Sequence, residues 1–175
     1  MPNELDDLRE HLDRYRAVTL QHFDVLSDQD LSWRPRPDAF SCAQQLLHIL
    51  QNEDFYVRGL SINEWDIERL RFPRPLPSKA ALRRMFDEVR QTTHSYLDTL
   101  TPDSLNEMCR PGHAPIDATV RTWLWFVLEH EIHHKAQLAE YLRALGHVPP
   151  YFGMPLPLGT RPDIAARENL GGVGQ

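Results

Sequence analysis

The sequence has 175 residues, which is the length of one domain with a single hydrophobic core. Hydrophobic residues make up 41% and charged residues 25%, so wholesale disorder and a fibrous repeat are excluded. Nineteen Lys and Arg against 25 Asp and Glu give a net charge of -6, and we therefore expect no nucleic-acid partner. The longest apolar run, 123–128, is far shorter than the roughly 20 residues of a membrane span.

The first seven residues are acidic and lack the layout of a signal peptide, so we expect a cytoplasmic protein with no membrane partner. Cys42 and Cys109 are far apart in the sequence and form no Cys-x-x-Cys motif, which predicts reduced thiols. The unusual feature of the composition is its nine histidines. Histidine is the commonest metal ligand, although most histidines in proteins bind no metal.

Four segments carry apolar residues at the three- and four-residue spacing of an amphipathic helix. The first covers 5–26. A Ser-x-x-Gln capping box that begins at Ser41 predicts the start of a second helix, which runs to about Gly59. Ser78 is a good N-cap for a third helix, whose apolar positions continue to Leu100.

The fourth helix is predicted to begin at 117–119 and to end at Gly146. Proline-rich segments at 34–37 and 72–77 predict connecting loops, because proline cannot continue a helix. Four helices without an alternating strand pattern predict an all-α fold, an antiparallel four-helix bundle. The expected domain boundaries are 1–146 for the bundle and 147–175 for an irregular C-terminal tail, packed on the bundle or extending from it.

Two histidines of the fourth helix have the spacing of a metal-binding pair. His130 and His134 are one helical turn apart and about 40° apart around the axis, so both imidazoles can reach one ion. The same spacing fits two partly buried histidines that bond to carbonyls or water. His133 lies on a different side of the helix from this pair, so we expect it at the surface or behind the site. A third ligand can come from a facing helix, and His48 is the best candidate, with His22 as its competitor.

Residues 130–134 also match His-Glu-x-x-His, in which the glutamate is the general base of zinc metalloproteases. The longer metzincin pattern is missing, because Gln137 stands in the region that follows the motif. No strand is predicted that would bind an extended peptide, so a protease is disfavoured. Glu131 has an alternative role, an ion pair with Lys135 one turn later on the outer face of the helix.

The loop 31–41 is followed in the second helix by the run 45–48 and Glu53, and the fourth helix contains 130–137 followed by Tyr141, Leu142, Arg143 and Gly146. In this order, these two elements resemble those of the DinB-like, or DinB/YfiT-like, metal-binding four-helix bundles. The resemblance covers roughly residues 5 to 146. It implies a homodimer and a site for one divalent ion, with water at the open positions. The implied metal ligands are His48, His130 and His134.

Three neutral imidazoles leave a divalent ion its full charge, so it can lower the pKa of a coordinated water or thiol. Zinc is the first expectation for this ligand set, and nickel and iron(II) are alternatives. The resemblance favours a metal-dependent thiol S-transferase, or a related detoxification enzyme, that activates a low-molecular-weight thiol such as bacillithiol, mycothiol or glutathione. The alternatives are a hydrolase that uses a metal-bound hydroxide and a non-catalytic metal-binding stress protein.

Several side chains near the predicted centre are candidates for a role with a small-molecule substrate. Glu131 is the candidate that moves protons in a hydrolase. Gln137 and Tyr141 are candidates for orienting a ligand beside the metal, with packing as their alternative role. The candidates for holding a carboxylate of the cosubstrate are Arg34, Arg36, Lys135 and Arg143.

Overall fold

The computed structural model describes residues 4–112 and 116–150. Four α-helices dominate it, which confirms the predicted all-α four-helix bundle, and their ends lie within three residues of the predicted positions. Their bounds are α1 Glu4–Val25, α2 Cys42–Ile62, α3 Lys79–Leu97 and α4 Val120–Ala144. The connections contain the 3₁₀ helices η1 Asp30–Ser32, η2 Ile67–Leu70 and η3 Ser104–Asn106 and the strands β1 Met108–Cys109 and β2 Ala118–Thr119.

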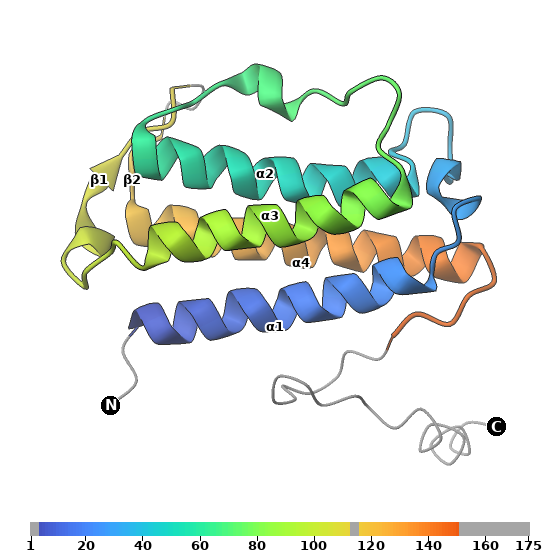
Figure 1. The fold of residues 1–175 in the computed structure, drawn as a ribbon, viewed down its shortest axis with the longest axis horizontal. Coiled ribbons are helices and arrows are strands. Elements are labelled where there is room, and N and C mark those ends of the chain that lie inside the picture. Colours follow the sequence, from blue (N-terminus) through green and yellow to red (C-terminus); the bar gives the residue numbers. More distant parts are fainter. Residues whose placement is uncertain (1–3, 113–115, 151–175) are drawn as a thin grey trace, which may run out of the picture.

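The four helices form two parallel pairs that run in opposite directions (Figure 1). α2 and α4, which carry the predicted metal ligands, pack against each other and run in opposite directions (Figure 1). α3 packs against α2 and runs in the same direction, as α1 does beside α4 (Figure 1). A link between two parallel helices must return along the length of the bundle. Residues 63–78, which include η2 and the second proline-rich segment, form this crossover segment.

The helix ends are capped as the sequence predicts. Ser41 Oγ accepts a hydrogen bond from Gln44 N, and Gln44 Oε1 accepts one from Ser41 N, which completes the capping box. Ser78 and Thr119 cap α3 and α4 through the same kind of side-chain contact to a backbone amide. Gly146 has a φ of +83°, the left-handed conformation that favours glycine just after a helix.

The core is divided into two apolar clusters, one toward each end of the bundle. One cluster joins the N-terminal halves of α1 and α4 to the C-terminal halves of α2 and α3. The other cluster joins the opposite halves of the same helices. Each helix passes from one cluster to the other near its middle, where it contributes a buried charged side chain to a network that joins all four helices. These four side chains, here called the ionic layer, are Arg16, Glu53, Arg90 and Glu131.

The ionic layer connects all four helices through paired charges. Arg16 pairs with Glu53, and its Nε donates to Glu131 Oε1 at 2.9 Å. Arg90 Nη2 donates to both carboxylates, at 3.3 Å to Glu53 Oε2 and 3.2 Å to Glu131 Oε2. Burial alone would raise the pKa of Glu53, but the two guanidinium groups hold it below its usual value. The predicted position of Glu131 on the outer face is wrong, because the packing of α4 against α1 turns this side chain into the interior, where it is 1% exposed.

The connection from α3 to α4 contains a short antiparallel ladder that the sequence did not predict. Met108 pairs with Thr119, and Cys109 pairs with Ala118. Strands of two residues are too short to show an alternating pattern. Cys42 and Cys109 are both free thiols, as predicted. No helix among the described residues is long and apolar enough to cross a membrane. Most of the predicted tail, residues 151–175, lies outside the described residues.

Candidate metal centre

Three histidines from α2 and α4 converge on one point between these helices. His48 projects from α2, and His130 and His134 project from α4. One ring nitrogen from each histidine lies within 4.8 Å of the other two, and His130 Nε2 is 3.2 Å from His48 Nε2. The structure therefore brings together the three residues that the sequence and the family resemblance nominated. Among the described residues, this is the one group of three or more side chains whose potential ligand atoms lie close enough to hold a metal ion.

The side chains behind His134 determine which of its ring nitrogens faces the other histidines. His134 Nδ1 is 2.7 Å from Gln45 Oε1 and 3.0 Å from Gln137 Oε1. Because both partners are carbonyl oxygens, Nδ1 carries the proton and Nε2 keeps its lone pair. Gln45 Nε2 in turn donates to Gln137 Oε1 at 3.0 Å and to Tyr141 Oη at 3.2 Å. These amides hold His134 in the tautomer that a metal ligand at Nε2 requires.

Burial keeps the three imidazoles neutral. It is the main cause that lowers the pKa of His130 to about 3 and that of His134 to about 4, and the neighbouring histidines lower both further. Burial also lowers the pKa of His48. Metal ligation needs unprotonated imidazole nitrogens. The site therefore presents ring lone pairs at neutral pH.

The donor set and its spacing fit a divalent transition-metal ion. Imidazole suits zinc, nickel and iron(II), and three protein ligands leave at least one coordination position for an exogenous ligand. Two ligands of a tetrahedral zinc ion with bonds near 2.05 Å lie about 3.3 Å apart. The nitrogens of His48 and His130 lie 3.2 Å apart, a separation at which two bare lone pairs repel unless a cation or proton lies between them.

Aromatic rings form an apolar wall beside the histidines. The ring centroids of Phe40 and Phe72 lie 5.3 and 6.4 Å from that of His48. The ring centroid of Phe126 lies 6.0 Å from that of His130. Phe126 lies one helical turn before His130, so helical spacing alone places it beside the cluster. Phe72 could not be nominated, because it comes from the crossover segment, whose position depends on the tertiary structure.

Three other predicted site residues lie outside the three-histidine cluster. His22 is a buried histidine whose Nδ1 is 2.8 Å from Val18 O, so it is a satisfied core side chain. His133 is exposed and its Nε2 is 3.0 Å from Gln137 Nε2. Lys135 is 5% exposed and its Nζ lies 5.8 Å from the centroid of the Tyr15 ring, which removes it from the surface where a cosubstrate would bind.

Gln45 is the residue of the site that the sequence reasoning missed. It lies one turn before His48 in α2, inside the run 45–48 that carries the family resemblance, and this was the available signal. Its side chain is 3% exposed and makes hydrogen bonds to α4 alone among the described helices. A buried glutamine with this geometry acts by orienting His134.

The fold and the cluster define a class of protein, a four-helix bundle with a crossover between two parallel helices and a candidate three-histidine metal centre. The chain belongs to the DinB superfamily, whose family profile matches residues 11–138. This finding confirms the resemblance carried by the loop 31–41 and the α4 segment 130–137.

Individual relatives share this fold at low sequence identity. The uncharacterized protein YjoA of Bacillus subtilis strain 168 is 26% identical over 138 residues, which cover 78% of this chain and 88% of YjoA. A crystal structure of the DinB-like YjoA superimposes with a TM-score of 0.69 at 22% identity, covering 86% of this chain and 99% of that one. The structure of YfiT from Bacillus subtilis, described as a probable metal-dependent hydrolase with an unusual four-helix bundle topology, superimposes with a TM-score of 0.68 at 20% identity. The match covers 84% of this chain and 94% of YfiT.

Proposed function

We propose that this chain binds one divalent metal ion, zinc in the first place, through His48, His130 and His134, and that it is a metal-dependent enzyme. The observation that carries this proposal is the convergence of three neutral imidazoles within 4.8 Å between α2 and α4. A divalent ion held by three neutral ligands retains its double positive charge and lowers the pKa of a coordinated thiol or water.

The first candidate activity is thiol S-transfer with a low-molecular-weight thiol. The thiol proton passes to solvent, the sulfur forms a bond to an electrophilic carbon, and the leaving group departs with its electron pair. In this reaction the three histidines position the thiol, and Gln45 holds His134 in the required tautomer. The apolar wall of Phe40, Phe72 and Phe126 favours an electrophile with an apolar body.

The second candidate activity is hydrolysis, which the description of YfiT as a probable metal-dependent hydrolase favours. This chain differs from the hydrolase predicted from the His-Glu-x-x-His match. The carboxylate of Glu131 accepts hydrogen bonds from Arg16 and Arg90 in the ionic layer, so it is not available as a general base. Hydrolysis also draws on a group that carries a proton to the leaving group, whereas S-transfer that displaces a halide does not, and this difference places S-transfer ahead of hydrolysis.

Elemental analysis of the purified protein tests the metal proposal directly. We expect about one metal ion per chain in the wild type and its loss in His48→Ala and His130→Ala. His133→Ala is the matched control, because this exposed histidine neighbours the cluster without belonging to it. Metal retained in both ligand variants, or a wild-type protein that takes up neither zinc nor nickel, would overturn the proposal.

The two activities are separated by assaying the metal-loaded protein with two kinds of substrate. One assay follows the transfer of glutathione, bacillithiol or mycothiol to an aryl halide, and the other follows the hydrolysis of a phenyl ester. Thiol transfer that disappears in His130→Ala supports the first candidate, whereas ester hydrolysis alone supports the second. A folded, metal-loaded protein without either activity supports the non-catalytic alternative. The homodimer stays a prediction, which the molecular mass in solution tests.

A further inference from the structure

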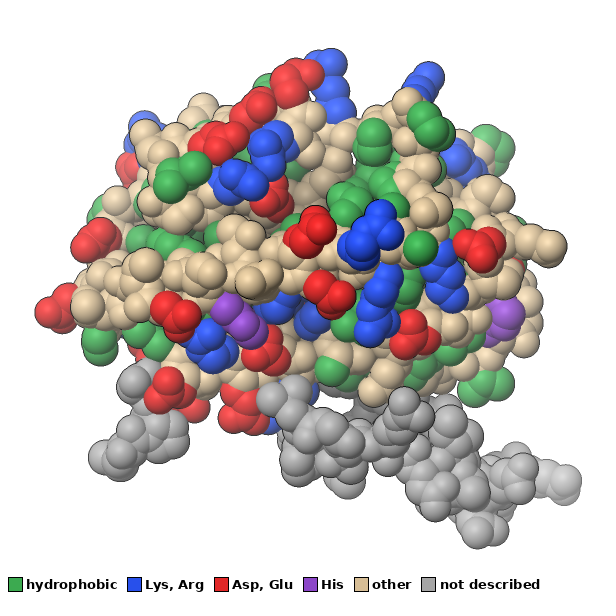
Figure 2. Space-filling model, in the orientation of Figure 1, with side chains coloured by type: hydrophobic (Ala, Val, Ile, Leu, Met, Phe, Trp, Pro, Cys, Tyr) green, Lys and Arg blue, Asp and Glu red, His purple; other side chains and the backbone are tan. Residues whose placement is uncertain are grey.

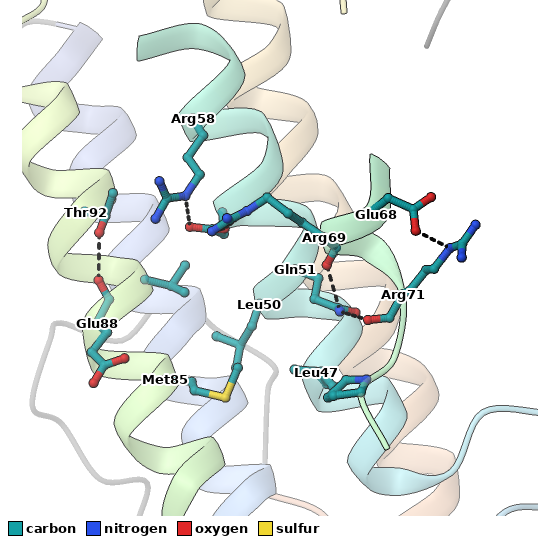
Figure 3. Close-up of a pocket in the computed structure, with 13 residues that line it drawn as sticks. Leu47, Leu50, Gln51, Arg58, Glu68, Arg69, Arg71, Met85, Glu88 and Thr92 are labelled. Atoms are coloured by element: carbon teal, nitrogen blue, oxygen red, sulfur yellow. Dashed lines mark hydrogen bonds and ion pairs between the residues drawn. The ribbon is translucent and has the colours of Figure 1, made fainter. Parts of the chain in front are cut away.

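A cavity of about 440 Å³ lies between α2, α3 and the crossover segment (Figure 3). Small-molecule sites in proteins commonly have volumes of about 300–1,000 Å³, with an apolar lining and a few polar groups. The cavity lies on the side of α2 that faces α3, whereas His48 faces α4, and none of the three clustered histidines lines it. It is therefore separate from the candidate metal centre.

The floor of the cavity is apolar and is supplied by both helices. Leu47 and Leu50 come from α2, and Met85 and Val89 come from α3 (Figure 3). Figure 2 shows hydrophobic side chains gathered in the hollow beside α3, with charged side chains around them. This arrangement provides apolar contact for a ligand body and polar contact for a head group at the rim.

The crossover segment forms one wall of the cavity and is tied to α2 by polar contacts. Gln51 Nε2 donates to Arg69 O at 2.9 Å and to Arg71 O at 2.7 Å, which sets the orientation of the Gln51 amide (Figure 3). Gln51 Oε1 is consequently left buried without a hydrogen-bond partner among the described residues. A buried acceptor without a donor costs free energy, which a ligand N–H at this wall would recover.

Three carboxylates and three guanidinium groups line the cavity, and all but one of them form ion pairs with residues at the rim. Arg58 and Arg69 share Asp54, with Nε–Oδ1 and Nη2–Oδ2 distances of 2.8 and 2.9 Å. Arg71 Nε lies 2.9 Å from Glu68 Oε2. Glu88, on the α3 side of the rim, has no ion-pair partner within the described part of the chain. Both unmatched polar groups of the cavity, this carboxylate and the amide oxygen of the crossover wall, are therefore acceptors.

We propose that this cavity binds a small organic cation, a primary ammonium group on an apolar body of about six carbons. The body contacts the floor formed by Leu47, Leu50, Met85 and Val89. The ammonium group donates hydrogen bonds and neutralises the carboxylate of Glu88. The site is independent of the metal ion and requires no residue of the histidine cluster.

Methionine methyl NMR on the full chain tests this site with hexylammonium chloride as the probe. The methyl group of Met85 reports on the floor, and that of Met108, which is 65% exposed on the β1–β2 ladder, is the internal control. We expect a saturable shift of the Met85 signal alone, with a dissociation constant on the order of 1 mM for a ligand of this size. Hexan-1-ol and hexanoate provide the same body without the cation and should bind more weakly.

Three variants locate the cation and separate this site from the metal centre. Glu88→Gln should weaken hexylammonium binding about twofold to fivefold, the effect of losing a solvent-exposed ion pair. Asp87→Asn is the matched control, because Asp87 is the exposed neighbour on α3 and does not line the cavity. His130→Ala, without metal, should bind hexylammonium as the wild type does.

Specific outcomes would overturn the proposal. An unshifted Met85 signal at about 20 mM probe, well above the expected dissociation constant, would show that the cavity binds no such ligand. Equal affinities for hexylammonium and hexan-1-ol, or equal weakening by Glu88→Gln and Asp87→Asn, would refute recognition of the cation. Loss of binding in His130→Ala would move the amine to the metal centre.

Discussion

Replacing Gln45 with leucine tests how the hydrogen bonds behind His134 contribute to metal affinity. Leucine fills a similar volume but removes the oxygen that lies 2.7 Å from His134 Nδ1. Loss of such a partner behind a metal-bound histidine typically weakens metal binding by about 10- to 100-fold. Gln137 Oε1 remains as a second acceptor at 3.0 Å, so we expect the lower end of this range, about tenfold. Removing both acceptors in the double variant should approach about 100-fold.

Zinc affinity is measured by competition with a chelating indicator, and circular dichroism shows whether each variant keeps its helices. Gln45→Glu is the matched control, because it retains an oxygen acceptor for His134 Nδ1 and should retain most of the affinity. If Gln45→Leu folds normally and binds zinc as tightly as the wild type, the amides do not orient His134. If the Gln45→Glu variant loses as much affinity as Gln45→Leu, the effect belongs to packing and not to the hydrogen bond.

Three further predictions concern stability, measured by urea unfolding. Glu131→Ala leaves the two buried arginines of the ionic layer undercompensated and should cost about 3–5 kcal/mol, whereas Glu140→Ala, which breaks an exposed pair, should cost at most about 1 kcal/mol. Burial lowers the pKa of His22 below its ordinary value of 6.5, so the unfolded chain binds the proton first and stability falls as pH drops below 6.5. The stability advantage of the wild type over His22→Gln should therefore shrink between about pH 7.5 and 5.5. Gly146→Ala should cost about 1 kcal/mol, because φ is +83° and no steric contact adds to the backbone strain.

A specific result would contradict each of these three stability predictions. Equal losses for Glu131→Ala and Glu140→Ala would mean that water or a rearranged side chain compensates the arginines. A pH-independent difference between the wild type and His22→Gln would mean that His22 takes up its proton in the folded state as readily as in the unfolded chain. An unchanged Gly146→Ala variant would show that the end of α4 relaxes out of the left-handed conformation.

The ionic layer links the two helices that carry the clustered histidines to each other and to α1 and α3. Glu53 is on α2 with His48, and Glu131 is adjacent to His130 on α4. Arg16 bridges these two carboxylates from α1, so it resists sliding of α2 along α4. Buried ion pairs contribute little net stability, but they can specify the register of helices.

Local sequence patterns by themselves determined the four helices, their caps and the pairing of His130 with His134. Each of these features depends on residues three or four positions apart, whose geometry the helix fixes before any tertiary contact forms. The same patterns favoured His48 as the third ligand and kept His22 as its competitor, and the family resemblance then implied His48.

The tertiary structure alone decided how the helices meet. It placed His48 against α4 and left His22 as a satisfied core histidine, and it turned Glu131 inward. It also brought Gln45 behind His134 and laid the crossover segment along α2. Helical periodicity specifies which residues share a face, but the partner of each face depends on packing between segments far apart in the chain, and no short-range pattern contains that information.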